Sequence, residues 1–480
     1  MLGGSLLKRN DMLQSYNLPS SSDIKWEKYK QKKYLHFDRP LPLSNEVKKN
    51  LLNPEWVTQH SFWPSIHFQQ TFNKYVPKEN YQQLKAAGVK NRELKEKKKK
   101  VRDIYFSAHI DSYIFKYYGD LLNMAYNEYA KKQDIDDAIL AYRNNKQGMS
   151  TIEFCYEVFE KLFQFENAII FSIDFTKYFD NINHLALKNN IQEVLHVPRL
   201  PKDLYTVFKN LTKFTYVKKT DIDKFLTNKY GTSNQKKLQQ MKIQRIMSAS
   251  EFQQFKQTYM YKHKKPYGIP QGSGMSAVCS NIHLIHFDQE VQQWVNTYQG
   301  VYKRYCDDIL IILPNVSSSN WIEYQQQLYH IIKKYEAIGL HIQENKTVVR
   351  FYEDGIIKNT QFEQSTLDYL GFVTDGIYTR IREKSLFKFY SRAYKKARQC
   401  KNITAYFKSK GKTRLYGRQS LYRIYTHLGK KSRKYGNFIT YNHRAHKKMK
   451  LLKKRTGAPV ISHIQKQTKR HWGRIQKKLY

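Results

Sequence analysis

Apolar and polar positions between Lys303 and Leu313 predict a strand, a tight turn and a second strand. The turn carries two adjacent carboxylates, Asp307 and Asp308, and an all-aliphatic run follows them. Neighbouring side chains of a strand point to opposite faces, so the two acids share a face only if the turn distorts the backbone. Acids beside an aliphatic run need a compensating cation or hydrogen bond. A divalent metal ion would supply that compensation, and a solvated acidic hairpin tip is the alternative.

A second apolar run also ends in an acid. Residues Asn167 to Phe175 have the pattern of a buried strand with Asp174 near its end, and a helix is expected to follow from Thr176. An aspartate at the end of an apolar strand is a frequent position for a metal ligand in α/β and α+β folds. The competing role for Asp174 is to cap the following helix.

A loop rich in glycine and proline precedes the acidic hairpin. It runs from Tyr267 to Ser276, and the residues behind it, Ala277 to Leu284, have a helical pattern. Glycine and proline permit close approach of the backbone to a ligand, and a helix N-terminus favours a phosphate. The alternative is an ordinary turn that leads into a helix.

The first hundred residues are predicted to be less regular. Residues up to Asn53 have the composition of a loosely structured extension, and a helix-like pattern from Asn80 ends in the lysine run Lys97 to Lys100. The run indicates a solvated face or a surface that contacts phosphates, and it is weak evidence for a nuclear-localisation signal.

Two polar features follow this region. A strand is expected over Val101–Phe106, and His109 and Asp111 then begin a tyrosine-rich helical stretch. They are candidates for a catalytic pair, and a structural histidine is the competing interpretation. Further along, a basic loop leads into another helix, for which Ser150 is the predicted N-cap.

The remaining predicted elements have no chemical signature of their own. They are an insertion with helices over 192–265, an amphipathic helix over 324–340, a turn and strand over 341–349, a glycine-broken strand over 367–373 and a helical patch over 386–397.

Charge narrows the class of partner. The 480 residues include 84 Lys and Arg against 40 Asp and Glu, a formal net charge of +44. An excess of this size predicts a polyanionic partner, and nucleic acid is favoured over a membrane because the chain has no long apolar segment. Beyond Glu383 the sequence contains no Asp or Glu, while Lys and Arg number 30. Interleaved tyrosines and phenylalanines suit base stacking.

Cysteine usage and the N-terminal sequence bear on location. Four cysteines, Cys155, Cys279, Cys306 and Cys400, lie far apart without metal-ligand or disulfide spacing. They indicate free thiols in a reducing compartment. The first residues have too short an apolar run for a signal peptide. We therefore expect a cytoplasmic protein.

The order of the motifs resembles motifs A to E of reverse transcriptases. The matching residues are Asp174 with Phe179 five residues on, Gly268-Ile269-Pro270-Gln271-Gly272, Tyr305-Cys306-Asp307-Asp308, Lys346 after a helix, and Tyr369-Leu370-Gly371-Phe372. The motif Arg304 to Asp308 resembles that of the bacterial group II intron and retron lineage. The stretch from Arg102 to Asp111, with Ala141-Tyr142-Arg143, is most similar to the defence-associated, Abi-like enzymes of unknown group.

The resemblance implies an α+β fold, a right-hand polymerase with fingers and palm and a helical, strongly basic thumb-like C-terminal domain. The expected domains are an N-terminal extension over 1–80, fingers over 81–165, a palm over 166–376 that contains the insertion 192–265, and the C-terminal nucleic-acid-binding domain over 377–480.

The family chemistry is the transfer of a nucleotide to a primer 3′-hydroxyl with two divalent ions. Magnesium is expected, with manganese as the alternative, because carboxylate oxygens and triphosphates suit a hard ion. The resemblance implies that Asp174 and Asp307 bridge the metals, that Asp308 is a weaker ligand and that the carbonyl of Phe175 completes one shell.

Other matching positions imply contacts with the substrates. Phe179 would act as the steric gate that selects dNTPs, with core packing as its competing role. Gln271, Gly272 and Tyr305 would support the template and the incoming nucleotide.

Two basic residues have implied roles at the triphosphate. Arg102 would clamp the triphosphate, with a surface salt bridge as the alternative, and Lys346 would lie near the leaving pyrophosphate or simply on a surface. Residues 369–372 would form the primer-grip hairpin.

The expected partners are an RNA template, in particular a structured non-coding RNA, a DNA product and dNTPs, with the oligomeric state left open. The acid-free C-terminal segment excludes an RNase H site, and it has no zinc-type cluster of His and Cys. The leading interpretation is an RNA-directed DNA polymerase in bacterial antiphage defence. The alternatives are a retron-type or template-independent DNA polymerase, an RNA-dependent RNA polymerase, and a non-catalytic RNA-binding protein on a palm fold.

Overall fold

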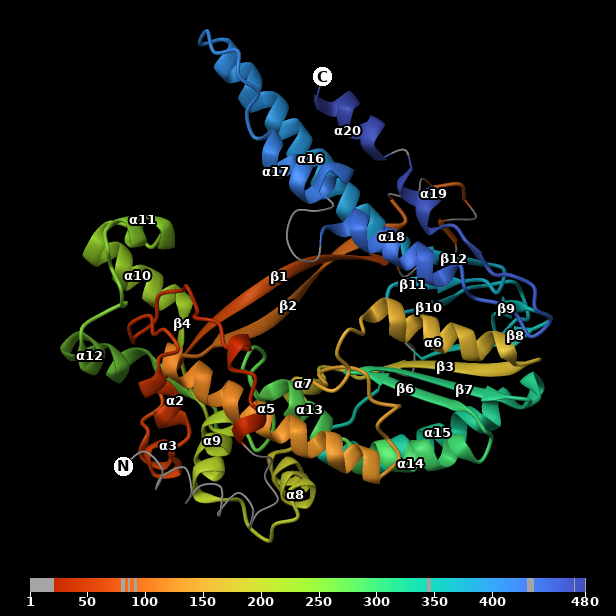
Figure 1. Ribbon diagram of the computed structural model, residues 1–480, viewed down its shortest axis with the longest axis horizontal. Helices are drawn as coiled ribbons and strands as arrows, with labels where there is room; N and C mark the ends of the chain where they lie inside the picture. The colour runs from red at the N-terminus through yellow and green to blue at the C-terminus, as the bar shows by residue number, and fades with distance from the viewer. Residues whose placement is uncertain are drawn as a thin grey trace.

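The computed structural model describes residues 21–78, 83–84, 87–89, 93–342, 347–429, 436–469 and 471–479. Its helices and strands form three sheets and the helical layers around them (Figure 1). The strands are β1 Ser65–Pro77, β2 Lys95–Phe106, β3 Ala168–Asp174, β4 Thr215–Lys218, β5 Met260–Lys262, β6 Val301–Tyr305, β7 Asp308–Pro314, β8 Val348–Glu353, β9 Ile356–Lys358, β10 Leu367–Tyr369, β11 Phe372–Thr374, β12 Tyr378–Ile381 and β13 Ile461–Ser462.

Helices outnumber strands along the chain. The α-helices are α2 Asn45–Leu51, α3 Pro54–Gln59, α5 His109–Lys132, α6 Thr151–Gln164, α7 Tyr178–Asn181, α8 His184–Val194, α9 Lys202–Thr212, α10 Lys219–Tyr230, α11 Gln235–Gln240, α12 Ala249–Tyr259, α13 Ser276–Ile282, α14 Ile285–Asn296, α15 Trp321–Lys334, α16 Glu383–Lys408, α17 Arg418–Tyr425, α18 Phe438–Met449, α19 Ile464–Thr468 and α20 His471–Leu479. Among the described residues, no helix is long and apolar enough to cross a membrane.

The central palm sheet has the strand order β6-β7-β3-β8-β9, with antiparallel neighbours throughout. Alternate side chains of β3 enter two different cores because successive residues of a strand face opposite sides. Ile169 and Phe171 pack with α5, α13 and α14 on one face, whereas Ile170 packs with α6 and C-terminal residues on the other. Figure 1 shows α6 above this sheet and α14 and α15 below it. The predicted α+β fold is confirmed.

The fingers sheet has the order β2-β1-β4-β5. Its long hairpin pairs β1 with β2 through twelve residue pairs, among them His67 with Tyr105. The helix predicted to run through Lys97 to Lys100 is wrong, because these lysines lie in β2, where pairing with β1 overrides the local pattern. Strands β4 and β5 join this sheet, so part of the segment 192–265 packs on the fingers sheet rather than on the palm sheet.

The N-terminal residues are more ordered than the sequence indicates. Described residues from 21 onwards form two short 3₁₀ turns, Ser21–Asp23 and Trp26–Lys28, followed by α2 and α3. They bury Ile24, Leu51 and Val57 in the main core. The predicted loose extension is therefore wrong for residues 21–53, since scattered apolar side chains find long-range partners that composition does not reveal. The predicted domain boundary at residue 80 falls between two paired strands and remains a prediction.

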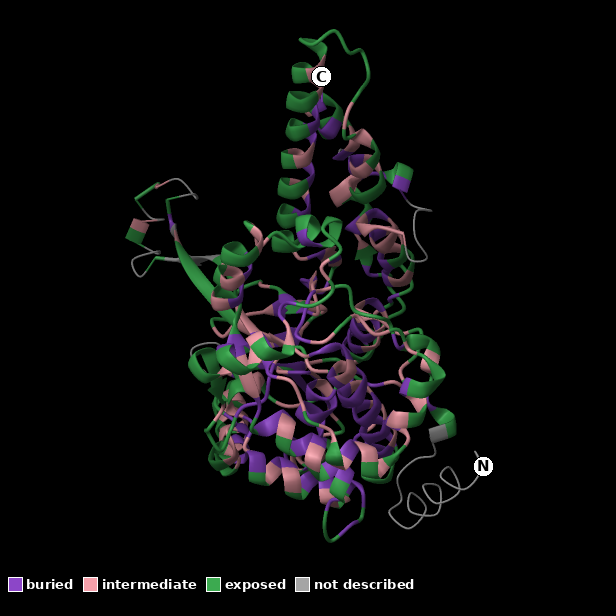
Figure 2. Cartoon of the chain, turned by 90° about the vertical axis from the view of Figure 1, so that its left-hand side faces the viewer, coloured by how far each residue is buried: buried purple, intermediate pink, exposed green. Residues whose placement is uncertain are grey.

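The C-terminal elements stand on a small third sheet, β10-β11-β12-β13. The 26-residue helix α16 rises from it and packs against α17 and α20 around a narrow core that includes Ala393, Ala397 and Leu421. Figure 2 shows how exposed these helices are compared with the buried elements of the palm. A helix with one thin apolar stripe leaves most of its surface to charged side chains.

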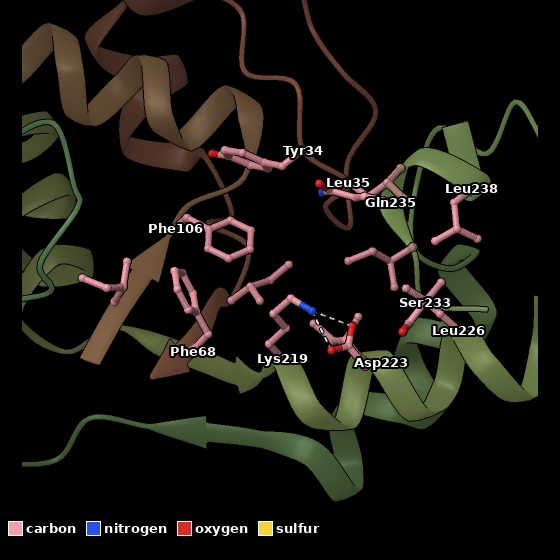
Figure 3. Close-up of a pocket in the computed structure, with 14 residues that line it drawn as sticks. Tyr34, Leu35, Phe68, Phe106, Lys219, Asp223, Leu226, Ser233, Gln235 and Leu238 are labelled. Carbon is pink, nitrogen blue, oxygen red and sulfur yellow. Dashed lines mark hydrogen bonds and ion pairs between the residues drawn. The ribbon is translucent and has the colours of Figure 1, made fainter. Parts of the chain in front are cut away.

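A cavity of about 480 Å³ lies between the fingers sheet and the helices α10 and α11 (Figure 3). Phe68 and Phe106 line the strand side, and Leu226 and Leu238 line the helix side. The fingers strand β2 thus has an apolar face that packs towards the segment 192–265, while its opposite face is free to meet the palm.

Candidate active site

The β3–β7 register brings the predicted acids together. Asp174 lies directly opposite Asp308, and the backbone N–H of Phe175 donates to the carbonyl of Asp307 over 3.4 Å. Asp307 and Cys306 form the two-residue turn between β6 and β7, and Cys306 has a φ of +63°. A positive φ at the first turn position matches the twist of a tight hairpin and is costly for a residue with a side chain. The predicted strand–turn–strand is confirmed.

The turn is held from behind by a buried ion pair. The guanidinium of Arg304 is fully buried and donates to both carboxylate oxygens of Asp288 over 2.7 and 2.5 Å. It also donates to the carbonyl of Cys306 over 3.1 Å and to Asn281. A bidentate pair of this kind fixes orientation as well as charge. Arg304 therefore locks the backbone immediately before the two acids.

Sequence reasoning missed Asp288 and Asn281 as partners of Arg304. Arg304 stands in the buried strand Val301–Tyr305, next to Lys303, and sequence reasoning assigns it only to a motif. The available signal was the cost of burying a charge in a strand, which requires a buried carboxylate elsewhere in the chain. Nothing local to Arg304 identifies Asp288, which lies 16 residues away on α14.

Electrostatics at the turn favour a cation. The pKa of Asp308 is raised to about 6, first by burial and then by the negative charges of Asp307 and Asp174. Repulsion between carboxylates is relieved by a divalent ion, so the donor set fits magnesium chemically. Within the described part of the chain, no group of three or more His, Cys, Asp or Glu side chains is closed into a preformed metal site. The negative charges of Asp174 and Asp307 thus act on Asp308, but the three carboxylates do not converge on a single metal-binding point.

The helical turn α7 places Phe179 beside the glycine-rich loop. The carbonyl of Phe179 accepts a hydrogen bond from the N–H of Ile269 over 3.0 Å, and its half-buried ring meets Tyr178 edge-on. Phe175 differs, because its ring is buried against Tyr178 and Phe287. Phe175 can thus offer a metal only its backbone carbonyl.

The glycine-rich loop touches the fingers strand β2 directly. The N–H of Tyr105 donates to the carbonyl of Gln271 over 3.2 Å. Gly272 has a φ of +116°, and a Cβ at this position would lie 2.7 Å from the carbonyl oxygen of Tyr105. A larger residue would therefore push the loop and the fingers strand apart. This contact joins the fingers to the palm beside α7.

Arg102 lies elsewhere on the same strand. It is exposed, and its guanidinium lies over the ring of Phe72 at 5.7 Å. Arg102 and Tyr105 are three residues apart, so their side chains leave opposite faces of β2. Gln271 meets β2 through the backbone N–H of Tyr105, at the free edge of this strand, whereas the guanidinium of Arg102 lies over Phe72 of the neighbouring strand. Lys346 lies outside the described residues.

The hairpin of β10 and β11 lies close to the acidic turn. Leu370 and Gly371 both have positive φ, 46° and 91°, as a two-residue turn of the hairpin type requires. Asp368 on this hairpin pairs with Arg382, and both charges act on the pKa of Asp308. Tyr305, paired with Asp308 across the β6–β7 hairpin, is half-buried.

Tyr142 is a neighbour of the turn that belongs to the motif Ala141-Tyr142-Arg143 but that sequence reasoning did not assign to the site. It has a φ of +62° and an exposed side chain, and its pKa is raised by burial of the hydroxyl and by Cys306 and Asp307. Asn123 donates to its carbonyl, which fixes the loop. The signal was its place in the basic loop ahead of Ser150. The predicted N-cap at Ser150 is confirmed and forms a capping box with Glu153.

His109 and Asp111 do not form a pair with one another. His109 Nδ1 lies 2.7 Å from Asp38, and Asp111 lies 2.7 Å from His60. Asp38 also accepts from the N–H groups of His109 and Ile110, so it caps α5. The structural interpretation of His109 agrees with this geometry.

Comparisons with known proteins give one family match. A family model described as Reverse transcriptase (RNA-dependent DNA polymerase) matches residues 121–374, more than half of the 480 residues. No curated protein matches the sequence.

Solved structures similar to this chain include telomerases from two Candida species. Apo telomerase from Candida tropicalis truncated from its C-terminal domain is 11% identical with a TM-score of 0.37, and the match covers 69% of this chain and 58% of that chain. Telomerase from Candida albicans in complex with a TWJ fragment of telomeric RNA is 13% identical with a TM-score of 0.36, and the match covers 70% of this chain and 51% of that chain. The chain thus spans little more than half the length of these telomerases.

Proposed function

The chain belongs to the reverse transcriptase family, and from this premise we propose that it is an RNA-directed DNA polymerase. It would add dNTPs to a primer 3′-hydroxyl by phosphoryl transfer. The observation that supports this most directly is the register that sets Asp174 opposite Asp308, with Asp307 in the adjoining turn. An RNA template and a DNA product are the partners that this activity requires.

The acids would hold two divalent ions, magnesium in the first instance. Such ions lower the pKa of the attacking hydroxyl and neutralise charge on the attacking and leaving oxygens. Asp174 and Asp307 would supply the bridging carboxylates, Asp308 a weaker one, and Phe175 its carbonyl. Arg304 would keep the turn in place while metal ions and substrates bind to and leave the carboxylates, since it donates a hydrogen bond to the carbonyl of Cys306.

The residues around the acids would select and align the substrates. Phe179 would be the steric gate, with its ring against the sugar of an incoming nucleotide so that a 2′-hydroxyl is excluded. Gln271 and Gly272 would hold the template and the incoming nucleotide against the fingers strand, and Tyr305 would also contact the substrates.

Arg102 and Lys346 keep their proposed roles at the triphosphate. For Arg102 this would require its guanidinium to leave the ring of Phe72 when the substrate binds.

The domain assignment extends this proposal. Residues 1–80 would form the N-terminal extension, 81–165 the fingers, 166–376 the palm with the insertion 192–265, and 377–480 a thumb-like domain. The exposed, acid-free helices beyond Glu383 support a role in gripping nucleic acid. The hairpin at residues 369–372 would hold the primer end.

We assign the enzyme to bacterial antiphage defence with an associated non-coding RNA, on its motif resemblance to the Abi-like enzymes of the group II intron and retron lineage. The described cysteines are all free and buried, in keeping with a reducing cytoplasm. The alternatives are a retron-type enzyme, a template-independent DNA polymerase and a non-catalytic RNA-binding protein.

The test is to purify the protein from a bacterial host with its flanking DNA and to sequence the nucleic acid that accompanies it. An Asp307→Ala/Asp308→Ala variant is the control. The proposal predicts a discrete RNA in both preparations and complementary DNA with the unaltered protein alone. RNA in both and DNA in neither would favour the RNA-binding alternative. DNA without a complementary RNA would favour template-independent synthesis.

A further inference from the structure

The C-terminal helices enclose a cavity of about 520 Å³. The name C-terminal pocket is used here for the hollow lined by Thr426, His427, Ile439, His443, His446, Lys450, Ser462, Gln465, Lys466, Thr468, Lys469, His471 and Trp472. Every lining residue comes from the last 55 residues of the chain, and none belongs to the palm or the fingers. The pocket is therefore separate from the candidate active site.

The lining is positive and has no acid. Lys450, Lys466 and Lys469 are exposed at the pocket, and among the described residues none of them has a carboxylate partner. No Asp or Glu is among the residues that line the pocket, and the sequence has none beyond Glu383. Positive charges held around a hollow repel one another, and an anion within it removes that repulsion.

The histidines add donors to the same hollow. Nδ1 of His446 lies 3.0 Å from the hydroxyl of Ser462. The pKa of His446 is lowered first by burial and then by the positive charge of Lys450 and by His443. With a lowered pKa, His446 is an uncharged donor near neutral pH, and the lysines of the pocket supply the charge-assisted hydrogen bonds to phosphate oxygens.

Aromatic rings form another part of the wall. Trp472 meets His427 edge-on at 5.1 Å and Tyr422 at 5.7 Å, so its ring position is fixed by neighbours. Any nucleobase can stack on an aromatic ring, whatever the sequence of the nucleic acid. The combination of fixed ring, three lysines and a hollow in the size range of ligand pockets fits one nucleotide better than a continuous backbone.

We propose that the C-terminal pocket binds a nucleoside 5′-phosphate group. Two sources carry that chemistry, the 5′-phosphorylated end of a nucleic-acid strand and a free mononucleotide. The proposal is independent of catalysis, because no residue of the pocket takes part in the proposed phosphoryl transfer.

The test uses the full chain and two short single-stranded RNAs of one sequence, labelled at the 3′ end, with a 5′-phosphate or a 5′-hydroxyl. Binding is measured by fluorescence anisotropy near physiological ionic strength, with adenosine 5′-monophosphate as competitor. The pocket variant is Lys450→Ser/Lys466→Ser. The control is Lys395→Ser/Lys408→Ser, which removes two exposed lysines from α16 outside the pocket.

The unaltered protein is expected to bind the phosphorylated RNA at least about tenfold more tightly than the hydroxyl form. The pocket variant should lose this preference, whereas the control should weaken both RNAs alike and keep it. Competition by the mononucleotide at concentrations near the dissociation constant of the phosphorylated RNA identifies the free nucleotide as a ligand, and competition only at far higher concentrations identifies the strand end.

Two results would overturn the proposal. One is equal affinity for both RNAs together with no effect of the mononucleotide. The other is a preference or a competition that persists in the pocket variant. The substituted lysines are exposed, so both variants should fold, and a thermal melt verifies this.

Discussion

Behind the palm turn, charged side chains are buried and paired, whereas on the C-terminal helices they are mostly exposed and positive. At the palm turn, residues 305–308, two carboxylates are held beside Asp174, and the guanidinium behind them is fully buried and paired with Asp288. Beyond Glu383 the chain has 30 Lys and Arg and no Asp or Glu, and most of these basic side chains are exposed.

The difference separates two uses of charge. A buried pair is costly to desolvate and strongly destabilising when broken, so it fixes a geometry. Exposed charges of one sign fix little and attract a polyanion over a distance, with a strength that falls as salt rises. The palm turn thus has the fixed geometry that a catalytic site needs. The exposed basic residues of the C-terminal helices, called the holding surface below, are suited to attracting and holding a polyanion. Four predictions test this contrast.

The largest effect is expected when the same substitution is placed in each region. Arg304→Met leaves Asp288 buried and unpaired, so the free energy of unfolding should fall by about 3–5 kcal/mol. Arg398→Met, on the exposed face of α16, should change it by no more than about 0.5 kcal/mol. Urea unfolding measures both. Equal small losses would contradict a locked palm turn. The double variant Arg304→Met/Asp288→Leu should recover much of the stability.

The second prediction concerns sugar selectivity. Phe179→Ala should raise the incorporation of rNTPs relative to dNTPs by about tenfold to a hundredfold, because the ring no longer blocks a 2′-hydroxyl. Single-nucleotide incorporation with each nucleotide type measures the ratio. Phe438→Ala, a half-buried ring among the C-terminal helices, is the control and should leave the ratio unchanged. Unchanged selectivity in the Phe179 variant would exclude the gate assignment.

The third prediction is a dependence on pH. The pKa of Asp308 is raised to about 6, so at pH 5 its carboxyl group is mostly protonated in the folded protein but ionised in the unfolded chain. Its ionisation therefore lowers the stability of the metal-free protein as pH rises through this range, and that stability is highest on the acid side. Magnesium needs the ionised form, so its apparent affinity should be about tenfold weaker at pH 5 than at pH 7.

Thermal shift with and without magnesium measures this dependence. Asp308→Asn is the matched variant and should flatten both pH profiles. A magnesium shift of the same size at pH 5 and pH 7 in the unaltered protein would contradict the electrostatic account of the turn.

The smallest effect is expected from the holding surface. Lys395→Ser/Lys408→Ser should reduce the salt dependence of single-stranded RNA binding by about 0.7 per lysine in the log–log slope. The control substitutes two lysines that already pair with acids, Lys219 with Asp223 and Lys334 with Glu290. Their loss should change the slope less. If both double variants changed the slope by the same amount, the lack of acids beyond Glu383 would have no effect on RNA binding.

Sequence patterns located the acidic turn well because its determinants are local. The tyrosine-rich arm before Asp307 and Asp308 and the aliphatic arm after them predict the hairpin, and the apolar run before Asp174 predicts β3. The Ser150 cap follows from four consecutive residues. In each case the interaction that decides the structure lies within a few residues.

Long-range partners explain the failures. The lysines at 97–100 are strand because β1 pairs with them, and residues 21–53 are ordered because they pack on α5 and its neighbours. No local pattern links Arg304 to Asp288, or places the guanidinium of Arg102 over Phe72 of the neighbouring strand. Tertiary pairing decides these features, and periodicity does not report it.

The most direct test of the account is extension of a DNA primer on a defined RNA template, with magnesium and all four dNTPs. The account predicts DNA complementary to the template from the unaltered protein, and a rate at least about a thousandfold lower for Asp307→Asn, which removes one charge without changing shape. Extension at an equal rate by both proteins, or none with either on any template, would contradict the assignment of the palm turn as the catalytic centre.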